Sequence, residues 1–166
     1  MHRHVAKSLG TMKSPALCTI CGIPLDSEHF DDSGVAPVPD VGEQVPLARF
    51  ELPPQYCGVL EYFSQFTVEH ARDSSKIETP GLQWLILSNN RPLYPYLNLD
   101  RIVNPWGYGS FQVSIRLDEN ATVEFVVRNI NRPVDPDETK RERVGGRIVG
   151  RYWYNTAYGD VAWRRS

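Results

Sequence analysis

The chain has 166 residues, with four tryptophans, eight tyrosines and six phenylalanines, which is enough for one domain with a real core and too few for two catalytic domains. Its formal net charge of −2 excludes a surface that is basic throughout, as a nucleic-acid-binding domain would be. No apolar run approaches the length of a membrane span, and the first residues lack the apolar segment of a signal peptide, so we expect a soluble chain without a signal peptide.

The first part of the chain, residues 1–51, is predicted to be an extended arm or loop segment. The first 14 residues carry one arginine, two lysines and no acid, whereas residues 24–51 carry seven acids against one arginine. Five prolines between positions 35 and 54 fix φ and remove backbone donors, which favours extended or loop-like chain outside the core. Two interpretations stay open: a solvated linker, or an arm that lies across a neighbouring subunit.

Strand patterns begin after residue 52. Residues 59–68 are rich in aromatic and β-branched side chains and follow a Pro-Pro pair that prevents an earlier helix start. The apolar run 81–87 is closed by a polar turn sequence and predicts a second, buried strand. Residues 147–155, which follow two glycines, predict another, and residues 160–163 predict a final short strand.

The clearest pattern is strict alternation of apolar and polar residues over 111–117, followed by three polar residues and then by a second segment with period two over 121–128. This arrangement predicts a β-hairpin with one buried face. Strands at this spacing, with no helical period longer than about two turns, predict an all-β fold. We expect an antiparallel β-sandwich or jelly-roll-like domain over residues 52–166, preceded by the extended N-terminal arm.

Two cysteines, Cys18 and Cys21, form the most specific motif in the chain, because two thiolates at this spacing are half of a tetrahedral zinc site. His29 and Cys57 are the predicted pair that completes a structural zinc site, which would fold the arm and would not catalyse a reaction. The alternatives are no cofactor with two free thiols at a turn, or a redox pair. Three cysteines are not a disulfide framework, which favours a reducing site of synthesis.

Catalytic patterns are missing from the sequence. It contains neither a nucleophile elbow of the G-x-S-x-G type nor a glycine-rich phosphate loop. Glu61 and Glu124, on two different strand candidates, are the one pair of carboxylates that we can place on either side of a cleft. We therefore predict that the protein is not an enzyme.

Aromatic residues concentrate in the second half of the chain, in Pro/Asn/Gly-rich loops and in the run 152–154. Strand alternation sends Trp153 to one face of its strand and the two flanking tyrosines to the other. Aromatic rings of this kind pack in a core, form a flat surface that binds sugars, or bind another protein. We favour an interface with a neighbouring chain, in which the arginines pair with acidic residues of that chain. A solvated strand edge explains the arginines almost as well. The predicted interface residues are Trp106, Tyr108, Arg147, Arg151, Tyr152, Trp153 and Tyr154.

Residues 52–155 resemble the small accessory structural proteins of tailed bacteriophages, of the decoration or cement class that sits on capsids. The features that carry this resemblance are the Leu-Pro-Pro sequence at 52–54, the Asn-Arg-Pro sequence at 90–92, the predicted hairpin at 111–128 and the closing segment 145–155. The resemblance implies a β-sandwich, self-association around symmetry axes and an arm that lies on neighbouring shell subunits. The Cys18 and Cys21 pair departs from that pattern.

We therefore expect a non-enzymatic structural subunit that binds and stabilises a larger protein assembly, namely a viral capsid. Its expected partners are capsid shell subunits and further copies of itself, with no membrane and no nucleic acid, and its expected location is the virion, assembled in the host cytoplasm. One alternative is a carbohydrate-binding or receptor-binding β-sandwich that uses Trp106, Tyr108 and residues 152–154. Another is a small zinc-containing adaptor organised by Cys18 and Cys21.

Overall fold

The computed structural model describes residues 6–7, 17–18, 23–67, 81–93 and 109–155. Within these ranges every regular element is a strand, apart from one 3-10 turn at Glu138–Lys140. The all-β class predicted from the sequence is confirmed. In this described part of the chain, no helix is long and apolar enough to cross a membrane.

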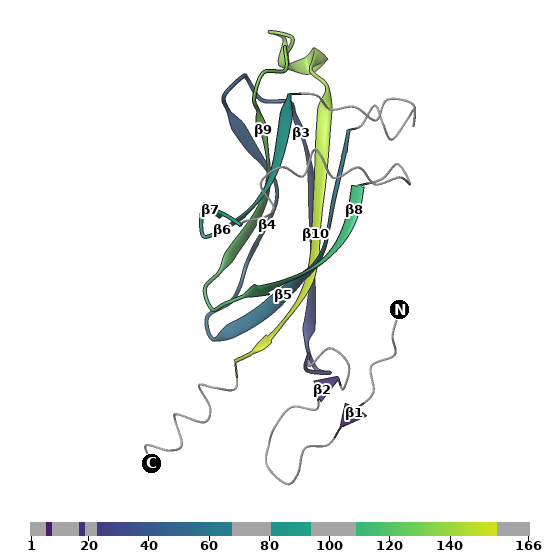
Figure 1. The fold of residues 1–166 in the computed structure, drawn as a ribbon, viewed down its shortest axis with the longest axis vertical. Coiled ribbons are helices and arrows are strands. Elements are labelled where there is room, and N and C mark those ends of the chain that lie inside the picture. The colour runs from purple at the N-terminus through teal and green to yellow at the C-terminus, as the bar shows by residue number, and fades with distance from the viewer. Residues whose placement is uncertain (1–5, 8–16, 19–22, 68–80, 94–108, 156–166) are drawn as a thin grey trace.

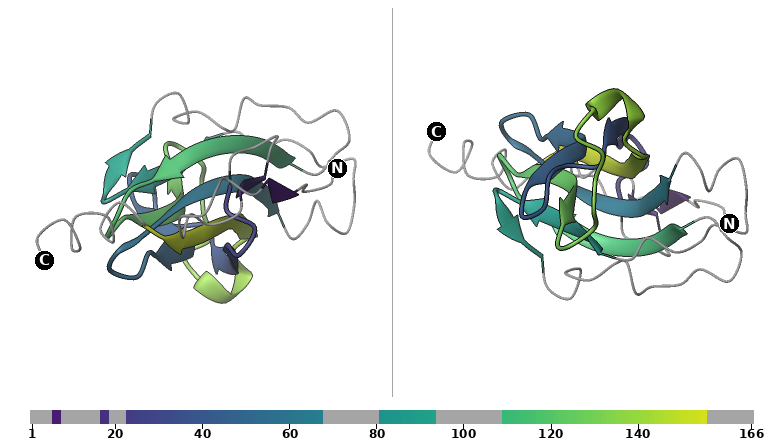
Figure 2. Two further views of the ribbon diagram at one scale, coloured as in Figure 1. Left: turned by 90° about the horizontal axis from the view of Figure 1, so that it is seen from below. Right: turned by 90° about the horizontal axis from the view of Figure 1, so that it is seen from above.

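Two four-stranded antiparallel sheets pack face to face, with their strands along the long axis of the molecule (Figures 1 and 2). The sheet that we call the β10 sheet has the order β3 (Glu28–Pro37), β10 (Arg143–Tyr154), β5 (Tyr56–Thr67), β8 (Gly109–Leu117). The β9 sheet has the order β4 (Gln44–Glu51), β9 (Thr122–Asn129), β6 (Leu82–Ser88), β7 (Arg91–Pro92). A separate short pair is formed by β1 (Ala6–Lys7) and β2 (Leu17–Cys18). The predicted antiparallel sandwich is therefore confirmed.

The core lies between the sheets and follows from the alternation of side chains along each strand. On β9, Val123, Phe125 and Val127 are completely buried. The ring of Phe125 lies 5.6 Å from that of Phe63 on β5 and 5.9 Å from that of Trp84 on β6. Large side chains from three strands of two sheets thus meet at one ring, and burial of such rings is the main favourable contribution to folding.

The predicted arm is wrong for residues 28–51, because these residues form β3 and β4, one strand in each sheet. Phe30, Val38 and Leu47 are buried members of the core. The prolines do not prevent strand formation because of where they lie: Pro37 ends β3, and Pro46 lies on the edge strand β4 beside an irregularity in its pairing. Edge strands and strand ends tolerate a missing backbone donor.

The predicted hairpin at 111–128 is also wrong, although both of its strands exist. β8 pairs with β5 in the β10 sheet, whereas β9 pairs with β4 and β6 in the β9 sheet. The connection crosses from one sheet to the other through a turn in which the Ala121 N–H donates to the Asp118 carbonyl at 3.1 Å and Asn120 has φ +55°. Strand alternation identifies a buried face but does not identify the neighbouring strand.

The other strand predictions differ from the structure mainly at their ends. β5 and β6 correspond to the predicted strands at 59–68 and 81–87. β6 is followed by a two-residue turn in which Asn89 and Asn90 have φ of 50° and 62°, the left-handed conformation that tight hairpin turns require. β10 begins at Arg143, so its glycine pair lies inside the strand. The strand predicted at 160–163 lies outside the described residues.

The two long sides of the sandwich are built differently. On the side of β3 and β4, which we call the closed side, the backbones of the two sheets touch: a Cβ on Gly34 would lie 2.3 Å from the Leu47 carbonyl oxygen. There the Arg49 N–H also donates to Asp32 Oδ2 at 2.7 Å. On the side of β8 and β7, the open side, the inward residues Phe111, Val113 and Ile115 of β8 are only partly buried, although Leu117 at the end of this strand is 1% exposed.

Candidate protein-binding face

The outer face of the β10 sheet carries most of the predicted interface residues that the structure describes. Arg147, Arg151 and Trp153 follow one another at intervals that place them on the same, outward side of β10. Neighbouring residues of β3 and β5 lie in register with them. We call this surface the arginine face, and it consists of Asp31, Val35, Glu61, Tyr62, Arg147, Val149, Arg151 and Trp153.

Arg147 of β10 makes a bidentate ion pair with Asp31 of the neighbouring strand β3. Its Nε donates to Oδ1 at 2.7 Å and its Nη2 donates to Oδ2. The side chains are 53% and 47% exposed, so water screens the pair. The hydrogen bond from Arg147 holds the pKa of Asp31 below its ordinary value, and Asp31 in turn raises the pKa of Arg147. The pair fixes the plane of a guanidinium group that still faces solvent.

Arg151 makes the second such pair, with Glu61 of β5, on the other side of β10. Its Nε donates to Oε2 at 3.0 Å and its Nη2 donates to Oε1. This pair is more withdrawn from water, with side chains 10% and 21% exposed. Val149 pairs with Tyr62 and Gly150 pairs with Leu60, so Glu61 is an extra residue in β5. The bulge turns Glu61 toward Arg151, a typical use of such irregularities.

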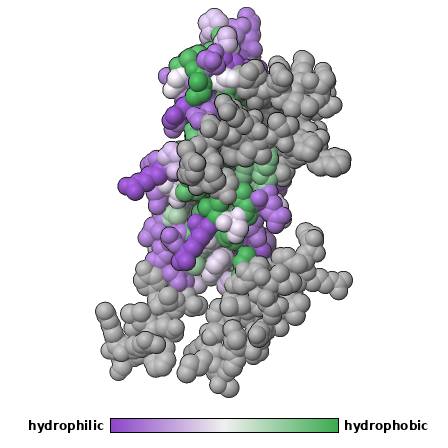
Figure 3. Space-filling model, viewed as in Figure 1, coloured by the Kyte–Doolittle hydropathy of each residue, from purple (hydrophilic) through white to green (hydrophobic). Residues whose placement is uncertain are grey.

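Apolar side chains lie between and beside the two ion pairs. Val149 stands between the two arginines along β10, in register with Asp31 on one side and Tyr62 on the other. Tyr62 and Val35 are each 41% exposed, and in the view of Figure 3 hydrophobic as well as hydrophilic residues reach the described surface. Tyrosine and arginine around a small apolar centre form the composition that dominates binding energy at protein interfaces.

The tyrosines on either side of Trp153 do not belong to this face. The Tyr152 hydroxyl donates to Glu28, which together with burial raises its pKa. The Tyr152 ring lies 5.3 Å from Phe50 and 5.6 Å from Tyr56. The run 152–154 is therefore divided between two faces, as strand alternation predicts, and Tyr152 is packed against other rings. The loop residues Trp106 and Tyr108 lie outside the described residues.

The four predicted zinc ligands are only partly placed. Cys18 lies in β2, and Cys21 is outside the described residues. His29 is exposed on β3, and Cys57 is half-buried on β5, where burial raises the pKa of its thiol. β10 lies between these two strands. Among the described residues, no group of three or more histidines, cysteines or acids could hold a metal ion, and the zinc site remains a prediction that requires both Cys18 and Cys21.

The two carboxylates considered for glycoside hydrolysis lie on different sheets. Glu61 is bonded to Arg151 on the outer face of the β10 sheet. Glu124 is an outward residue of β9 and lies 3.3 Å from Arg49. Two carboxyl groups on opposite outer faces of a sandwich do not flank a common cleft.

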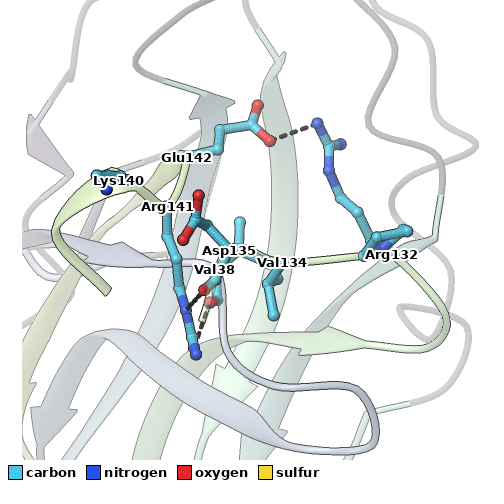
Figure 4. A pocket seen from close by; sticks show the side chains of 8 residues that line it. Val38, Arg132, Val134, Asp135, Lys140, Arg141 and Glu142 are labelled. Carbon is cyan, nitrogen blue, oxygen red and sulfur yellow. Dashed lines mark hydrogen bonds and ion pairs between the residues drawn. The ribbon is translucent and has the colours of Figure 1, made fainter. Parts of the chain in front are cut away.

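A polar pocket of about 260 Å³ lies at the end of the sandwich that carries the 3-10 turn (Figures 1 and 4). Arg132 and Glu142 form an ion pair in it, while Arg141 donates to the Asp135 carbonyl at 2.7 Å and lies 2.9 Å from Asp40. The contact between Arg141 and Asp40 joins the β9–β10 connection to the β3–β4 connection, whereas the other two lie within the β9–β10 connection. The pocket is lined by Val38, Arg132, Pro133, Val134, Asp135, Lys140, Arg141 and Glu142.

Sequence reasoning missed five residues of the arginine face. It assigned Asp31 and Val35 to the arm, considered Glu61 only as one of two cleft carboxylates, and treated Tyr62 and Val149 as ordinary strand residues. For β3 a signal exists, since Phe30, Asp32, Gly34 and Ala36 alternate with exposed residues. It is weak because one of these inward residues is charged and one lacks a side chain. The bulge at Glu61 has no signal that we can find in the sequence.

No protein-family model matches the sequence, and no curated protein matches it significantly. The functional interpretation therefore depends on the arginine face and on the other described surfaces of the two sheets.

Proposed function

We propose that this protein is a non-enzymatic structural subunit that binds another protein chain through the arginine face and so stabilises a larger assembly, namely a viral capsid. The observation that carries the proposal is the exposed Tyr62, which lies beside Val149 between two arginines that are each held by a carboxylate. The capsid is the assembly that the resemblance to phage decoration proteins implies.

The ion pairs prepare this face for binding. Ordering a long, flexible side chain during association costs about 0.5–1.5 kcal/mol. Arg147 is already ordered by Asp31 and its side chain is 53% exposed, so a partner loses less free energy on immobilising it. Arg151, bonded to Glu61 and only 10% exposed, contributes to the rigidity of the face. The arrangement of an apolar centre inside a charged border is also the common anatomy of a protein interface.

The experiment is site-specific photo-crosslinking in cells that produce the protein from its own gene. A benzophenone amino acid replaces Tyr62 in the full chain, and a matched variant carries it at Arg128, an exposed residue on the outer face of the β9 sheet. After irradiation, particles are separated from free protein by density gradient. We expect one crosslinked protein species from position 62, in the particle fraction, and none from position 128.

Three other results would count against the proposal. If neither position crosslinks, or if both do so equally, the arginine face is not the binding surface. A single crosslinked species from position 62 that stays outside the particle fraction would support the arginine face as a binding surface but contradict a capsid as the partner. As a quantitative check, Tyr62→Ala should weaken co-sedimentation with particles by about tenfold or more, whereas Val41→Ala, at a 56% exposed site in the β3–β4 connection, should leave it unchanged.

A further inference from the structure

The end of the sandwich opposite the 3-10 turn presents two tyrosine rings that do not belong to the arginine face (Figure 1). Tyr154, the last residue of β10, lies in register with Tyr56, the first residue of β5. Tyr154 is on the side of β10 that faces the β9 sheet, yet it is 44% exposed, and Tyr56 is half-buried beside it. Their rings lie 5.8 Å apart at 88°, edge to face. The pair therefore offers ordered aromatic surface to solvent.

Two turns lie beside these rings and are fastened to each other. The Leu52 N–H donates to the Ala121 carbonyl at 2.9 Å, which joins the β4–β5 connection to the β8–β9 connection. Asn155 contacts both turns: its N–H donates to the Gln55 carbonyl at 2.7 Å, and its Nδ2 donates to Glu119 Oε1 at 3.3 Å. These hydrogen bonds hold polar groups in place next to the rings, as a preorganised binding site requires. We call this surface the tyrosine end, and it consists of Gln55, Tyr56, Glu119, Asn120, Tyr154 and Asn155.

Gln55 has a backbone conformation that glutamine rarely adopts. It is the third residue of the turn 53–56, which the Tyr56 N–H closes by donating to the Pro53 carbonyl at 3.1 Å, and its φ is 69°. Glycine adopts this conformation without strain, whereas a side chain here costs free energy. The Gln55 side chain accepts the Tyr154 hydroxyl through Oε1 at 3.2 Å. Strained residues concentrate at binding sites, so this position indicates a function for the carboxamide.

We propose that the tyrosine end binds a neutral saccharide. A sugar ring combines an apolar face with hydroxyl groups around its edge, so it needs an exposed aromatic ring next to groups that donate and accept hydrogen bonds. Tyr154 provides the ring. Gln55 is exposed, and its Nε2 has no hydrogen-bond partner among the described residues, so it can donate to a hydroxyl group. Asn120, exposed in the adjacent turn, provides a second carboxamide.

The charges at the tyrosine end favour a neutral sugar. Glu119 is part of the site and Asp118 precedes it, while the neighbouring Arg116 is already bonded to Asp118 at 2.9 Å. Carboxylates at this end repel sialylated, sulfated or phosphorylated sugars. A proline-rich peptide is the other ligand that tyrosine rings commonly bind. It has few N–H donors for an acceptor such as Glu119, whereas every sugar hydroxyl can donate to it.

The test combines saccharide binding by the full chain with the thermal stability of each variant. An array of neutral and anionic glycans is screened first, and the neutral glycan with the highest signal is then titrated by NMR. We expect Tyr154→Ala to weaken this binding by at least about tenfold. Gln55→Gly should weaken it by about threefold or more, because a hydrogen bond is lost. The Tm of Gln55→Gly should not fall below that of the wild type, because the strain at this position is removed.

Tyr62→Ala is the matched control, since Tyr62 is a similarly exposed tyrosine on the arginine face. It should leave saccharide binding unchanged. Conversely, Tyr154→Ala should leave co-sedimentation with particles unchanged. The saccharide site and the capsid-binding face are therefore tested separately, and either can fail without the other.

Several outcomes would overturn the proposal. The first is an array on which no neutral glycan gives a signal. Another is saccharide binding that persists in both Tyr154→Ala and Gln55→Gly, or that Tyr62→Ala weakens equally. If Gln55→Gly lowers the Tm and leaves binding intact, the carboxamide of Gln55 has a structural role only and the assigned site is wrong. Decaproline is titrated in the same way, and a response of Tyr154 to decaproline but to no glycan would assign the site to a peptide instead.

Discussion

The closed and open sides of the sandwich differ in how the edge strands of the two sheets are covered. On the closed side β3 and β4 follow each other in the chain and cross from one sheet to the other. Their backbones touch at Gly34, and Asp32 accepts the Arg49 N–H. On the open side β8 has no such partner among the described residues, and Phe111 is only partly buried. One side is completed by contacts between the two sheets, whereas three inward residues of β8 stay partly exposed on the other.

The largest expected difference between the two sides is in the cost of truncating an inward side chain. Leu47 on the closed side is 5% exposed, so Leu47→Ala should lower the free energy of unfolding by about 2–5 kcal/mol. Val113→Ala on the open side removes partly exposed surface and should cost only about 1 kcal/mol. Urea unfolding at low protein concentration measures both, and equal losses would show that the two sides are equally packed.

A smaller effect is expected from adding one methyl group on the closed side. In Gly34→Ala the new Cβ would lie 2.3 Å from the Leu47 carbonyl oxygen, a backbone atom, so one of the two strands must move. Forced movement of this kind costs about 1–3 kcal/mol. The adjacent Ser33→Ala, at an exposed position, is the control and should change stability by no more than about 0.5 kcal/mol. A stable Gly34→Ala protein would mean that the sheets can separate at this side.

The hydrogen bond from Arg49 to Asp32 should be worth less, because it lies at an exposed edge. Removing its acceptor in Asp32→Ala should cost about 1 kcal/mol. The more specific readout is hydrogen exchange, since the Arg49 amide loses its only described acceptor and should exchange faster. Amides of β9 in the middle of the same sheet are the internal reference. Unchanged exchange at Arg49 would show that Asp32 does not cover this edge.

The smallest effect is a pH dependence on the outer face, which leaves both sides of the sandwich intact. The pKa of Asp31 is lowered in the folded protein by the hydrogen bond from Arg147. Its contribution to stability is therefore present above the unfolded pKa of about 3.9 and is lost as the pH falls through the lower, folded value. In Arg147→Met the carboxyl titration of Asp31, followed by NMR, should move up to the ordinary range. A midpoint that does not move would mean that Arg147 is not the cause.

The sequence was informative about strands and poor at predicting their partners. Alternation over 111–117 and 121–128 located two real strands, but period two contains no information on pairing, so it gave a hairpin where β8 and β9 separate into two sheets. Composition misled the prediction for residues 28–51, because their prolines and acids lie at edges and exposed positions while Phe30 and Leu47 enter the core.

For the candidate site, sequence reasoning found three of the four residues of β10 and missed Val149 and the residues contributed by other strands. Arg147, Arg151 and Trp153 lie on one strand, and their common face follows from spacing alone. Asp31 and Glu61 reach them through cross-strand register and through a bulge. Register is set by the packing of two complete sheets, which single-sequence patterns do not contain.

The position of β10 also determines when this protein can fold. β10 is the last described strand of the chain, yet it lies between β3, the first strand of the sandwich, and β5. On the ribosome, β3 and β5 must therefore wait without their shared neighbour until Arg143–Tyr154 has been made. Contacts between segments so far apart in the sequence slow folding and prolong the exposure of strand edges that can aggregate. Chaperone binding until β10 has been synthesised would therefore shorten the time during which these edges are exposed.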